Sequence, residues 1–486
     1  MYYLGIDIGT SSVKILAADR DCKEIVTESR DYNVYYPREN WVEQDACDWW
    51  EGTKDAIKAL AGRIDISKVR SVSFSGQMHG MVALDGEGNP LRRAVLWCDG
   101  RTEVENNYLN NDIGRERLTE YTGNQSFCGF TAPKILWLRN NEPENYNKAK
   151  MYLLPKDYII YRMSGKYATD VSDASGTLYF DVAKRCWSKP MLDILGITED
   201  QLPAVYESYE VVGNIDPDVA DQLGLSHDVK IVAGAGDQAA AAVGVGATNA
   251  GVASASLGTS GVIFVSSDRY SADSENRLHS FAHANGRWHQ MGVILSAALS
   301  QKWWIKQILG SQYDPALDEA EKSPAGSNNL LFAPYLNGER TPHNDPNVRG
   351  AFIGLSSTTS QGDMTRAMLE GVAFALRDTY EILREMGIDF QTVRLSGGGT
   401  KAPLWIQIIA DVLGKTAEII ETNEGSALGA AILAMVGAGE YPTVDSACEN
   451  NIKVSKRVEP IQENIPVYDR QYAKFKGVYG MLSMQN

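Results

Sequence analysis

Apolar and polar positions alternate in the first stretch of the chain. Residues 4–8 read Leu-Gly-Ile-Asp-Ile, which is the period-2 pattern of a strand with one apolar face. A turn of small residues follows at 9–12, and apolar residues return at 13–16 as a second strand. We therefore expect a hairpin whose turn offers backbone N–H groups and hydroxyls to a phosphate and its magnesium, next to the carboxylate of Asp7.

The same pattern occurs a second time near the middle of the chain. Residues 256–262 read Ser-Leu-Gly-Thr-Ser-Gly-Val, against Asp-Ile-Gly-Thr-Ser-Ser-Val at 7–13. A hairpin duplicated half a chain apart predicts two lobes of common design. The copies differ at one informative position, where Asp7 is replaced by Ser256. Two such turns with one carboxylate between them favour a nucleotide held in a cleft between unlike halves.

Strand and helix periods continue through the rest of the chain. Asp45 is placed as an N-cap in front of a helical stripe, and residues 69–75 form the next strand pattern. Apolar residues at helical spacing predict helices at 363–386 and 403–413 and a single last helix across 468–479. This alternation of strands and helices predicts an α/β fold.

Two strand ends carry candidate chemistry. The strand at 69–75 runs into Gly-Gln-Met-His-Gly at 76–80, where polar residues are placed to face a ligand crevice. For His79, a turn histidine bonded to backbone and a ligand-binding histidine are equally open. The strand at 229–232 runs into a glycine turn and Asp237, which begins an alanine-rich helix. We expect this carboxylate to stay ionised and exposed, as a general base would, with a plain N-cap aspartate as the alternative.

Composition and charge exclude several classes of protein. The chain has 486 residues, of which 44% are hydrophobic and 22% charged, as in a globular protein of two or three domains. Its net charge of −16 argues against a general binder of nucleic acid or anionic membranes. The uncharged stretch 238–267 is too weakly apolar to span a membrane. The chain runs straight into its first strand without a signal peptide, so we expect a cytoplasmic protein.

Cysteines and histidines give no sign of a structural metal site. The six cysteines are scattered without a CxxC motif, which is typical of reduced thiols. His279, His283 and His289 are four and six residues apart, but no cysteine or acidic residue accompanies them at helical spacing. A packed, aromatic-rich pair of strands is therefore favoured over a metal site.

Three classes of function remain. An ATP-dependent phosphotransferase would use the paired turns for phosphates, Asp7 for the metal, the glycines at 397–399 for the nucleoside and Asp237 as base; no P-loop is present. A dinucleotide enzyme would use G-x-G-x-x-A at 234–239, but the acidic residue needed about twenty residues later is absent. A sugar sensor would have lost its base or metal carboxylate and gained a basic DNA-binding segment, and neither change is seen.

Two longer segments resemble the signatures of a known family. Residues 129–141, Gly-Phe-Thr-Ala-Pro-Lys-Ile-Leu-Trp-Leu-Arg-Asn-Asn, resemble the first signature of the FGGY family of carbohydrate kinases, and 350–370 resemble its second. Family-like segments extend from Tyr3 to about Ala434. The resemblance implies an α/β fold of two actin-like (ribonuclease H-like) domains with a catalytic cleft between them.

The resemblance also implies a division of labour and a reaction. The first domain, 1–247, would hold the sugar site, the metal carboxylate and the base, and the second, 248–486, the nucleotide. The turn at 75–80 and the segment 172–177 are similar to those of family members that phosphorylate D-xylulose. The implied reaction converts ATP and D-xylulose into ADP and D-xylulose 5-phosphate, in pentose (xylose) catabolism. L-ribulose, another ketose or a polyol stays open as substrate, as does the non-catalytic sensor.

Site residues follow from the match position by position. The catalytic base is Asp237, and the metal carboxylate is Asp7. The residues expected to contact the sugar are Gln77, Met78, His79, Asp237 and Gln238, the last standing where some relatives have Asn. Those expected around the nucleotide are Thr10, Ser11, Ser12, Gly258 and Thr259 for the phosphates and Gly398 and Gly399 for the nucleoside.

Cofactors and partners follow from the same match. We expect ATP and Mg²⁺ as cofactors and a small sugar as the other ligand. Nucleic acid and membranes are not expected as partners. The oligomeric state is left open, with a homodimer as one alternative.

Overall fold

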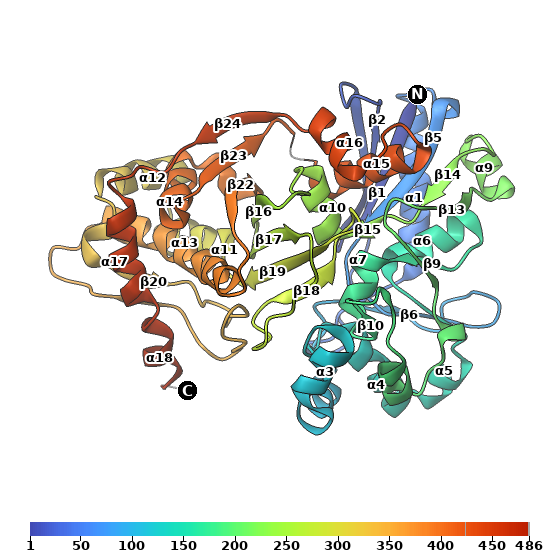
Figure 1. The fold of residues 1–486 in the computed structure, drawn as a ribbon, viewed down its shortest axis with the longest axis horizontal. Coiled ribbons are helices and arrows are strands. Elements are labelled where there is room, and N and C mark those ends of the chain that lie inside the picture. Colours follow the sequence, from blue (N-terminus) through green and yellow to red (C-terminus); the bar gives the residue numbers. More distant parts are fainter. Residues whose placement is uncertain (423, 485–486) are drawn as a thin grey trace.

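The protein folds into two lobes (Figure 1). Its structure, a computed structural model, describes residues 1–422 and 424–484. Each lobe is built on a seven-stranded mixed sheet with helices packed against it. The order of strands in the first sheet is β13 (Val211–Asn214), β14 (Lys230–Val232), β5 (Val69–Gly76), β1 (Tyr2–Ile8), β2 (Ser12–Ala18) and β3 (Ile25–Asp31), with β15 (Ala235–Gly236) paired to β5. The order in the second is β18 (His279–Ala282), β19 (Trp288–Ile294), β17 (Gly261–Ser267), β16 (Gly251–Leu257), β22 (Phe390–Ser396), β23 (Thr416–Ile420) and β24 (Val454–Val458).

Six consecutive strands of each sheet pair in the same directions; β15 in the first sheet and β18 in the second have no counterpart. In the first, β3, β2 and β1 are antiparallel neighbours, β1, β5 and β14 are parallel, and β13 closes the edge antiparallel. In the second, β19, β17 and β16 are antiparallel, β16, β22 and β23 are parallel, and β24 is antiparallel. The duplication expected from the repeated hairpin is therefore confirmed, together with the α/β fold.

The two hairpin turns are similar but differ in length. Ile8 pairs with Val13, which leaves four residues in the first turn. Leu257 pairs with Gly261, which leaves three in the second. Relative to the sequence repeat, the pairing of the two strands is therefore shifted by one residue in the second hairpin. The longer turn is the one that follows Asp7.

Three of the helices predicted from sequence lie close to their predicted positions. Helix α1 (Ala46–Ala61) starts after Asp45, whose carboxylate accepts a 2.9 Å hydrogen bond from the backbone N–H of Cys47. Helices α13 (Gln361–Glu385) and α14 (Pro403–Leu413) match their predicted ranges, and both are largely buried.

The prediction of a single last helix is wrong. The structure has α17 (Ile465–Phe475) and α18 (Val478–Ser483), separated at Gly477. The Gly477 backbone N–H bonds to the carbonyl of Lys474, three residues back, so the regular i−4 pattern ends there. Glycine favours such a break because its backbone loses the most freedom inside a helix.

Helices α10 (Asp237–Gly244) and α15 (Gly425–Ala438) join the two halves of the chain. A methyl group at Gly429 would lie 1.8 Å from the carbonyl oxygen of Ala240, and one at Gly5 would lie 2.0 Å from that of Ala427. Only glycine permits backbones to approach this closely. Helix α15 thus packs on α10 and β1 of the first lobe although it comes from the second half of the sequence, as Figure 1 shows.

No helix in the described part of the chain is long and apolar enough to cross a membrane.

Candidate active site

A cavity of about 200 Å³ lies in the cleft between the lobes. Its lining comes from both halves of the chain: Met78, His79, Trp97, Asp237 and Gln238 from the first, and Ser260, Val262, Met291, Val293 and Arg340 from the second. Four of the five sugar-contact residues predicted from sequence therefore meet in one place. Small polar ligands bind in concave sites of this kind, where a few polar groups converge within a partly apolar wall.

His79 occupies a strained turn at the edge of this cavity. Its φ angle is +68°, in the left-handed region that non-glycine residues rarely adopt. The ring Nδ1 lies 2.7 Å from the carbonyl oxygen of Gly176. Burial lowers the pKa of His79 to about 3, so the ring is neutral at physiological pH. A carbonyl can only accept, so Nδ1 carries the proton and Nε2 is left as an acceptor. His79 thus bonds to backbone, as one alternative expected, and it also lines the cavity; its binding of a ligand stays a prediction.

Asp237 is not the exposed, fully ionised carboxylate that the sequence suggested. Burial and, to a lesser extent, the nearby negative charge of Asp7 raise its pKa to about 7, against the hydrogen bonds from Gln238, which lower it. Desolvation of the carboxylate outweighs the favourable helix N-terminus. A pKa near the working pH suits a general base, because the group can both accept and release a proton.

Asp7 lies at the end of β1, opposite Lys14 of β2 and Ser75 of β5. Its Oδ1 has no hydrogen-bond partner among the described residues. Burial raises the pKa of Asp7, while the Ser75 hydroxyl and the charge of Lys14 lower it. A buried carboxylate oxygen without a partner is costly, and a bound cation would satisfy it.

The first hairpin turn is held from several sides. The Trp97 indole N–H donates a 3.0 Å hydrogen bond to the Thr10 hydroxyl, and the Gln44 amide donates to the Thr10 carbonyl at 2.6 Å. The amide of Gln77 donates to Gly9 at 3.3 Å and to Gln44 at 2.8 Å. Gln77 is absent from the cavity lining, and its amide nitrogen supports the turn. Its Oε1 has no partner among the described residues, so the predicted sugar contact stays a prediction.

The second hairpin turn opens onto a larger cavity of about 510 Å³. Thr259 and Gly398 line it, with Ala298, Leu299, Tyr313, Leu317 and Ala402 supplying an apolar wall. The carbonyl oxygens of Gly258 and Thr259 accept hydrogen bonds from the first backbone N–H groups around helix α11 (Ala298–Lys302). Gly399 is turned away, since a methyl group there would lie 2.7 Å from the Leu257 side chain. Gly398 has open space in front of it.

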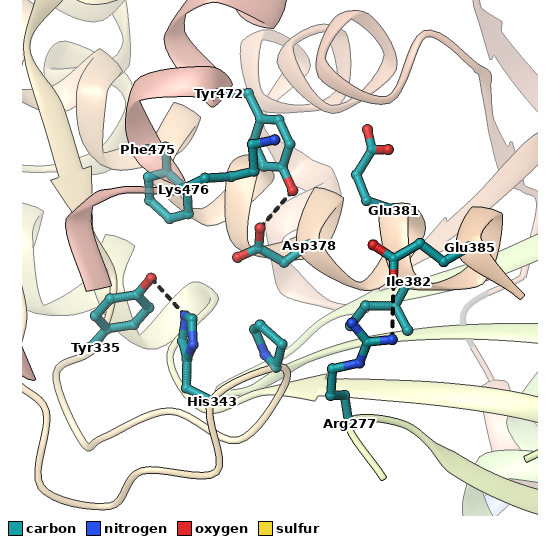
Figure 2. A pocket seen from close by; sticks show the side chains of 11 residues that line it. Arg277, Tyr335, His343, Asp378, Glu381, Ile382, Glu385, Tyr472, Phe475 and Lys476 are labelled. Atoms are coloured by element: carbon teal, nitrogen blue, oxygen red, sulfur yellow. Dashed lines mark hydrogen bonds and ion pairs between the residues drawn. The ribbon is translucent and has the colours of Figure 1, made fainter. Parts of the chain in front are cut away.

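A separate cavity of about 290 Å³ lies inside the second lobe, between α13, α17 and the loop that carries His343 (Figure 2). Its charged groups have partners within the protein: Tyr472 donates a 2.7 Å hydrogen bond to Asp378, and Arg277 pairs with Glu385 at 2.9 Å. None of the site residues predicted from sequence lines it. The cleft cavity is therefore the candidate active site.

The segment 172–177 is buried, although its composition also fitted a solvated loop. The Ser172 hydroxyl accepts a 3.1 Å hydrogen bond from the Gly236 N–H, beside Asp237, and donates to Asp170 at 2.6 Å. Asp170 is in turn paired with the buried Lys156 at 2.9 Å. This network sets the backbone in front of Asp237.

Sequence reasoning also missed polar and aromatic residues at or beside the cleft. Trp97 and Arg340 line the cavity, the fully buried Lys134 donates to the His79 carbonyl, and the fully buried Lys156 pairs with Asp170. Lys134 and Lys156 stood inside recognised segments, but nothing local distinguishes a buried lysine from a solvated one. Arg340 comes from a loop more than a hundred residues after Asp237, so only the tertiary fold brings the two together.

The three spaced histidines do not form a metal site. Within residues 1–422 and 424–484, no group of three potential ligands could hold a metal ion. His289 stacks on Phe264 with ring centroids 4.0 Å apart, and His283 lies edge-on to the same ring. Burial lowers the pKa of His279, His283 and His289. The predicted aromatic-rich strand pair is confirmed.

Known proteins match this chain over nearly its whole length. The model of the FGGY family of carbohydrate kinases, N-terminal domain, matches residues 2–244, and that of the C-terminal domain matches 253–438. The xylulose kinase of Escherichia coli is 42% identical over 439 residues, covering 90% of each chain, and that of Staphylococcus epidermidis is 38% identical over 481 residues, covering 98% of this chain and 96% of the relative. Among solved structures, the xyloylose kinase of Brucella ovis superposes with a TM-score of 0.95 at 36% identity and full coverage of both chains. The ligand-bound xylulose kinase of Lactobacillus acidophilus gives a TM-score of 0.95 at 26% identity, covering 99% of this chain and 98% of that one.

Proposed function

The chain belongs to the FGGY family of carbohydrate kinases, and on that premise we propose that it transfers the γ-phosphoryl group of ATP to the 5-hydroxyl of D-xylulose. The products are ADP and D-xylulose 5-phosphate. The observation that carries the proposal is the cleft cavity, which brings the poised carboxyl of Asp237 together with His79 and Met78. The xylulose kinases that it resembles over nearly their full length support this choice of sugar.

Asp237 acts as the general base in this proposal. Its carboxylate accepts the proton of the sugar hydroxyl while the hydroxyl oxygen attacks the γ-phosphorus, and the bond from phosphorus to the leaving ADP oxygen breaks. Its backbone is set by the hydrogen bond from Gly236 to Ser172, at 3.1 Å. The negative charge of Asp7 raises the pKa of Asp237 and so makes it a stronger base.

Mg²⁺ fits the carboxylate of Asp7. The unpartnered Oδ1 supports a cation there, and magnesium is commonly held by one or two protein carboxylates together with substrate phosphates. When bound to Asp7, the ion would neutralise negative charge that develops during phosphoryl transfer. The Ser75 hydroxyl and Lys14, on either side of β1, help to keep Asp7 ionised.

The two hairpin turns hold the phosphates from opposite lobes. Thr10, Ser11 and Ser12 supply N–H and hydroxyl groups from the first lobe, and Gly258 and Thr259 supply them from the second. The adenosine lies in the larger cavity beside Gly398, whose apolar wall suits a base and ribose. Closure of the lobes would bring the two turns together and keep water away from the phosphoryl group.

The sugar lies between Met78, His79 and Gln238 and the second-lobe residue Arg340. The Nε2 atom of neutral His79 accepts a hydrogen bond from a sugar hydroxyl, and the Gln238 amide can donate or accept one. Because Arg340 reaches in from the other lobe, a bound sugar contacts both lobes at once.

An ADP-release assay with a panel of ketoses and polyols tests the function. We expect the highest kcat/KM for D-xylulose, with L-ribulose and other sugars lower. Preference for another ketose would change the substrate but not the reaction. ADP release with none of the sugars, by protein that binds ATP, would contradict the proposed kinase activity.

A further inference from the structure

Lys134 is a fully buried lysine whose charge is directed at the sugar turn. It lies in α4 (Thr131–Asn141), and its side chain is 0% exposed. Its ammonium donates 2.7 Å hydrogen bonds to the carbonyl oxygens of His79 and Gly129. Both acceptors are neutral backbone groups.

No ion pair compensates the charge of Lys134 among the described residues. Asp99 is the carboxylate that most raises its pKa, but both Asp99 oxygens are engaged by the Arg101 guanidinium, at 2.8 and 2.7 Å. Burial nevertheless lowers the pKa of Lys134 to about 7. Burying a cation against carbonyls alone costs free energy of folding. The burial of Lys134 is therefore better explained by a functional role than by stability.

A second donor from the same helix reaches the same carbonyl. The Thr131 hydroxyl donates to the His79 carbonyl at 3.2 Å, and Thr131 and Lys134 are three residues apart on one face of α4. His79 is the residue with the left-handed φ of +68°. Two donors therefore hold the backbone oxygen of a strained residue, and strain of this kind persists only where the surroundings enforce it.

The imidazole of His79 is fixed from the other side. Nδ1 bonds to the Gly176 carbonyl at 2.7 Å, and the ring stacks on Phe130 with centroids 4.6 Å apart. A methyl group at position 176 would lie 2.6 Å from the His79 ring, so the slot for the ring exists only because residue 176 is glycine. Backbone and ring together leave one orientation for Nε2.

We propose that Lys134, assisted by Thr131, is a positioning residue of the sugar site: it holds the His79 carbonyl in the left-handed turn and thereby presets the His79 imidazole as an acceptor for a sugar hydroxyl. Lys134 itself does not line the cavity. This inference rests on the proposed sugar kinase function.

A double-mutant cycle with D-xylulose and ATP tests the coupling to His79. Hydrogen bonds from charged donors correspond to a change of about ten- to a hundredfold, so K134M should raise the KM for D-xylulose by at least about tenfold. The KM for ATP should stay within about twofold of wild type. In an H79A background, where no imidazole is left to position, K134M should cost less than about threefold. Equal losses in both backgrounds, or equal changes in both KM values, would overturn the proposal.

R139M is the matched control for K134M. Arg139 lies in the same helix and also donates to backbone carbonyls, those of Ile194 and Leu195 at 3.1 and 3.2 Å, away from the cavity. Its removal should lower the thermal midpoint and leave the sugar KM unchanged. If R139M raised the sugar KM as much as K134M does, the effect would be general destabilisation. If K134M does not fold, T131V removes the weaker of the two donors and should show a smaller rise in KM that also disappears with H79A.

A readout without turnover separates this inference from the proposed function. In ¹⁵N-histidine NMR spectra of the full chain, the signal that H79A removes should report a neutral ring protonated at Nδ1. In K134M that signal should shift toward a mixture of tautomers. An unchanged His79 signal in folded K134M would contradict positioning by Lys134, even if the enzyme phosphorylated no sugar at all. Lack of activity with a changed signal would count against the proposed function alone.

Discussion

The indole of Trp97 donates a 3.0 Å hydrogen bond to the hydroxyl of Thr10. Trp97 lines the cleft cavity, and Thr10 belongs to the first hairpin turn. One side chain therefore joins the wall of the proposed sugar site to the turn where the phosphoryl group is expected. The ring is 44% exposed in this structure, so it is placed at the opening of the cleft.

W97F keeps an aromatic side chain and removes the indole N–H donor. A neutral hydrogen bond contributes about 0.5–1.5 kcal/mol, so we expect a loss of about two- to tenfold in kcat/KM for the sugar. T10V, which removes the acceptor, should cost about the same, and the double variant should cost no more than either single change. Steady-state kinetics of the three variants measure these losses. Additive losses in kcat/KM would show that Trp97 and Thr10 are not coupled and would contradict the prediction.

D237A should fold, bind ATP and lose activity. A positioned general base contributes about 10²- to 10⁴-fold to the rate, and kcat should fall by that factor. Because the buried carboxyl has a raised pKa and is repelled by Asp7, removing its charge should not lower the thermal midpoint. Turnover within a few fold of wild type would rule out Asp237 as the base.

The pH profile of kcat/KM for the sugar should have an acid limb near pH 7. The pKa of Asp237 is raised to about 7, and the base works only when deprotonated. The contribution of this base is therefore complete above its pKa and is lost as the pH falls through it. His79, with its pKa lowered to about 3, does not titrate in this range.

Lys134 also has a pKa near 7 and supplies the control for this profile. Its deprotonation occurs as the pH rises, so it cannot produce an acid limb through loss of its charge. K134M should retain the limb at lower overall activity. Disappearance of the acid limb in K134M would contradict its assignment to Asp237.

D7N should weaken the dependence on Mg²⁺ and abolish most turnover. Loss of one preorganised electrostatic contact costs about 10²- to 10³-fold in kcat. Chelation of Mg²⁺ should stop the wild-type enzyme without unfolding it, and added Mg²⁺ should restore it. Since Asp7 Oδ1 has no partner among the described residues, the Asn variant should be at least as stable as wild type in thermal unfolding. Wild-type turnover in D7N would exclude Asp7 as the metal carboxylate.

G429A should destabilise the contact between α10 and α15. Its methyl group would lie 1.8 Å from the Ala240 carbonyl oxygen, and backbone cannot yield as a flexible side chain does. Overpacking of this kind costs about 1–3 kcal/mol or more, measured by urea unfolding. G480A is the control, since no atom lies within 4 Å of the added methyl group, and it should be neutral or stabilising by about 0.4–1 kcal/mol.

Local patterns predicted the elements of the fold because strand and helix periods are properties of neighbouring residues. The hairpin at 4–16 and the helix at 403–413 are present as predicted. The repeat at 256–262 correctly predicted a second lobe. The break at Gly477 was missed, because a single glycine inside an apolar stripe leaves the period intact. The seating of α15 against the first lobe has no local signal at all.

Sequence by itself identified the main functional groups of the cleft: the carboxylates of Asp7 and Asp237, the imidazole of His79 and the glycine turns. It also identified the family, through the signatures elsewhere in the chain. Tertiary structure alone decided their states. Burial set the pKa of Asp237 near 7 and made His79 neutral, and packing engaged the Gln77 amide nitrogen with Gln44 and Gly9. Protonation and hydrogen bonding depend on the water that packing removes and on groups a hundred residues away, such as Arg340, and no local pattern contains either.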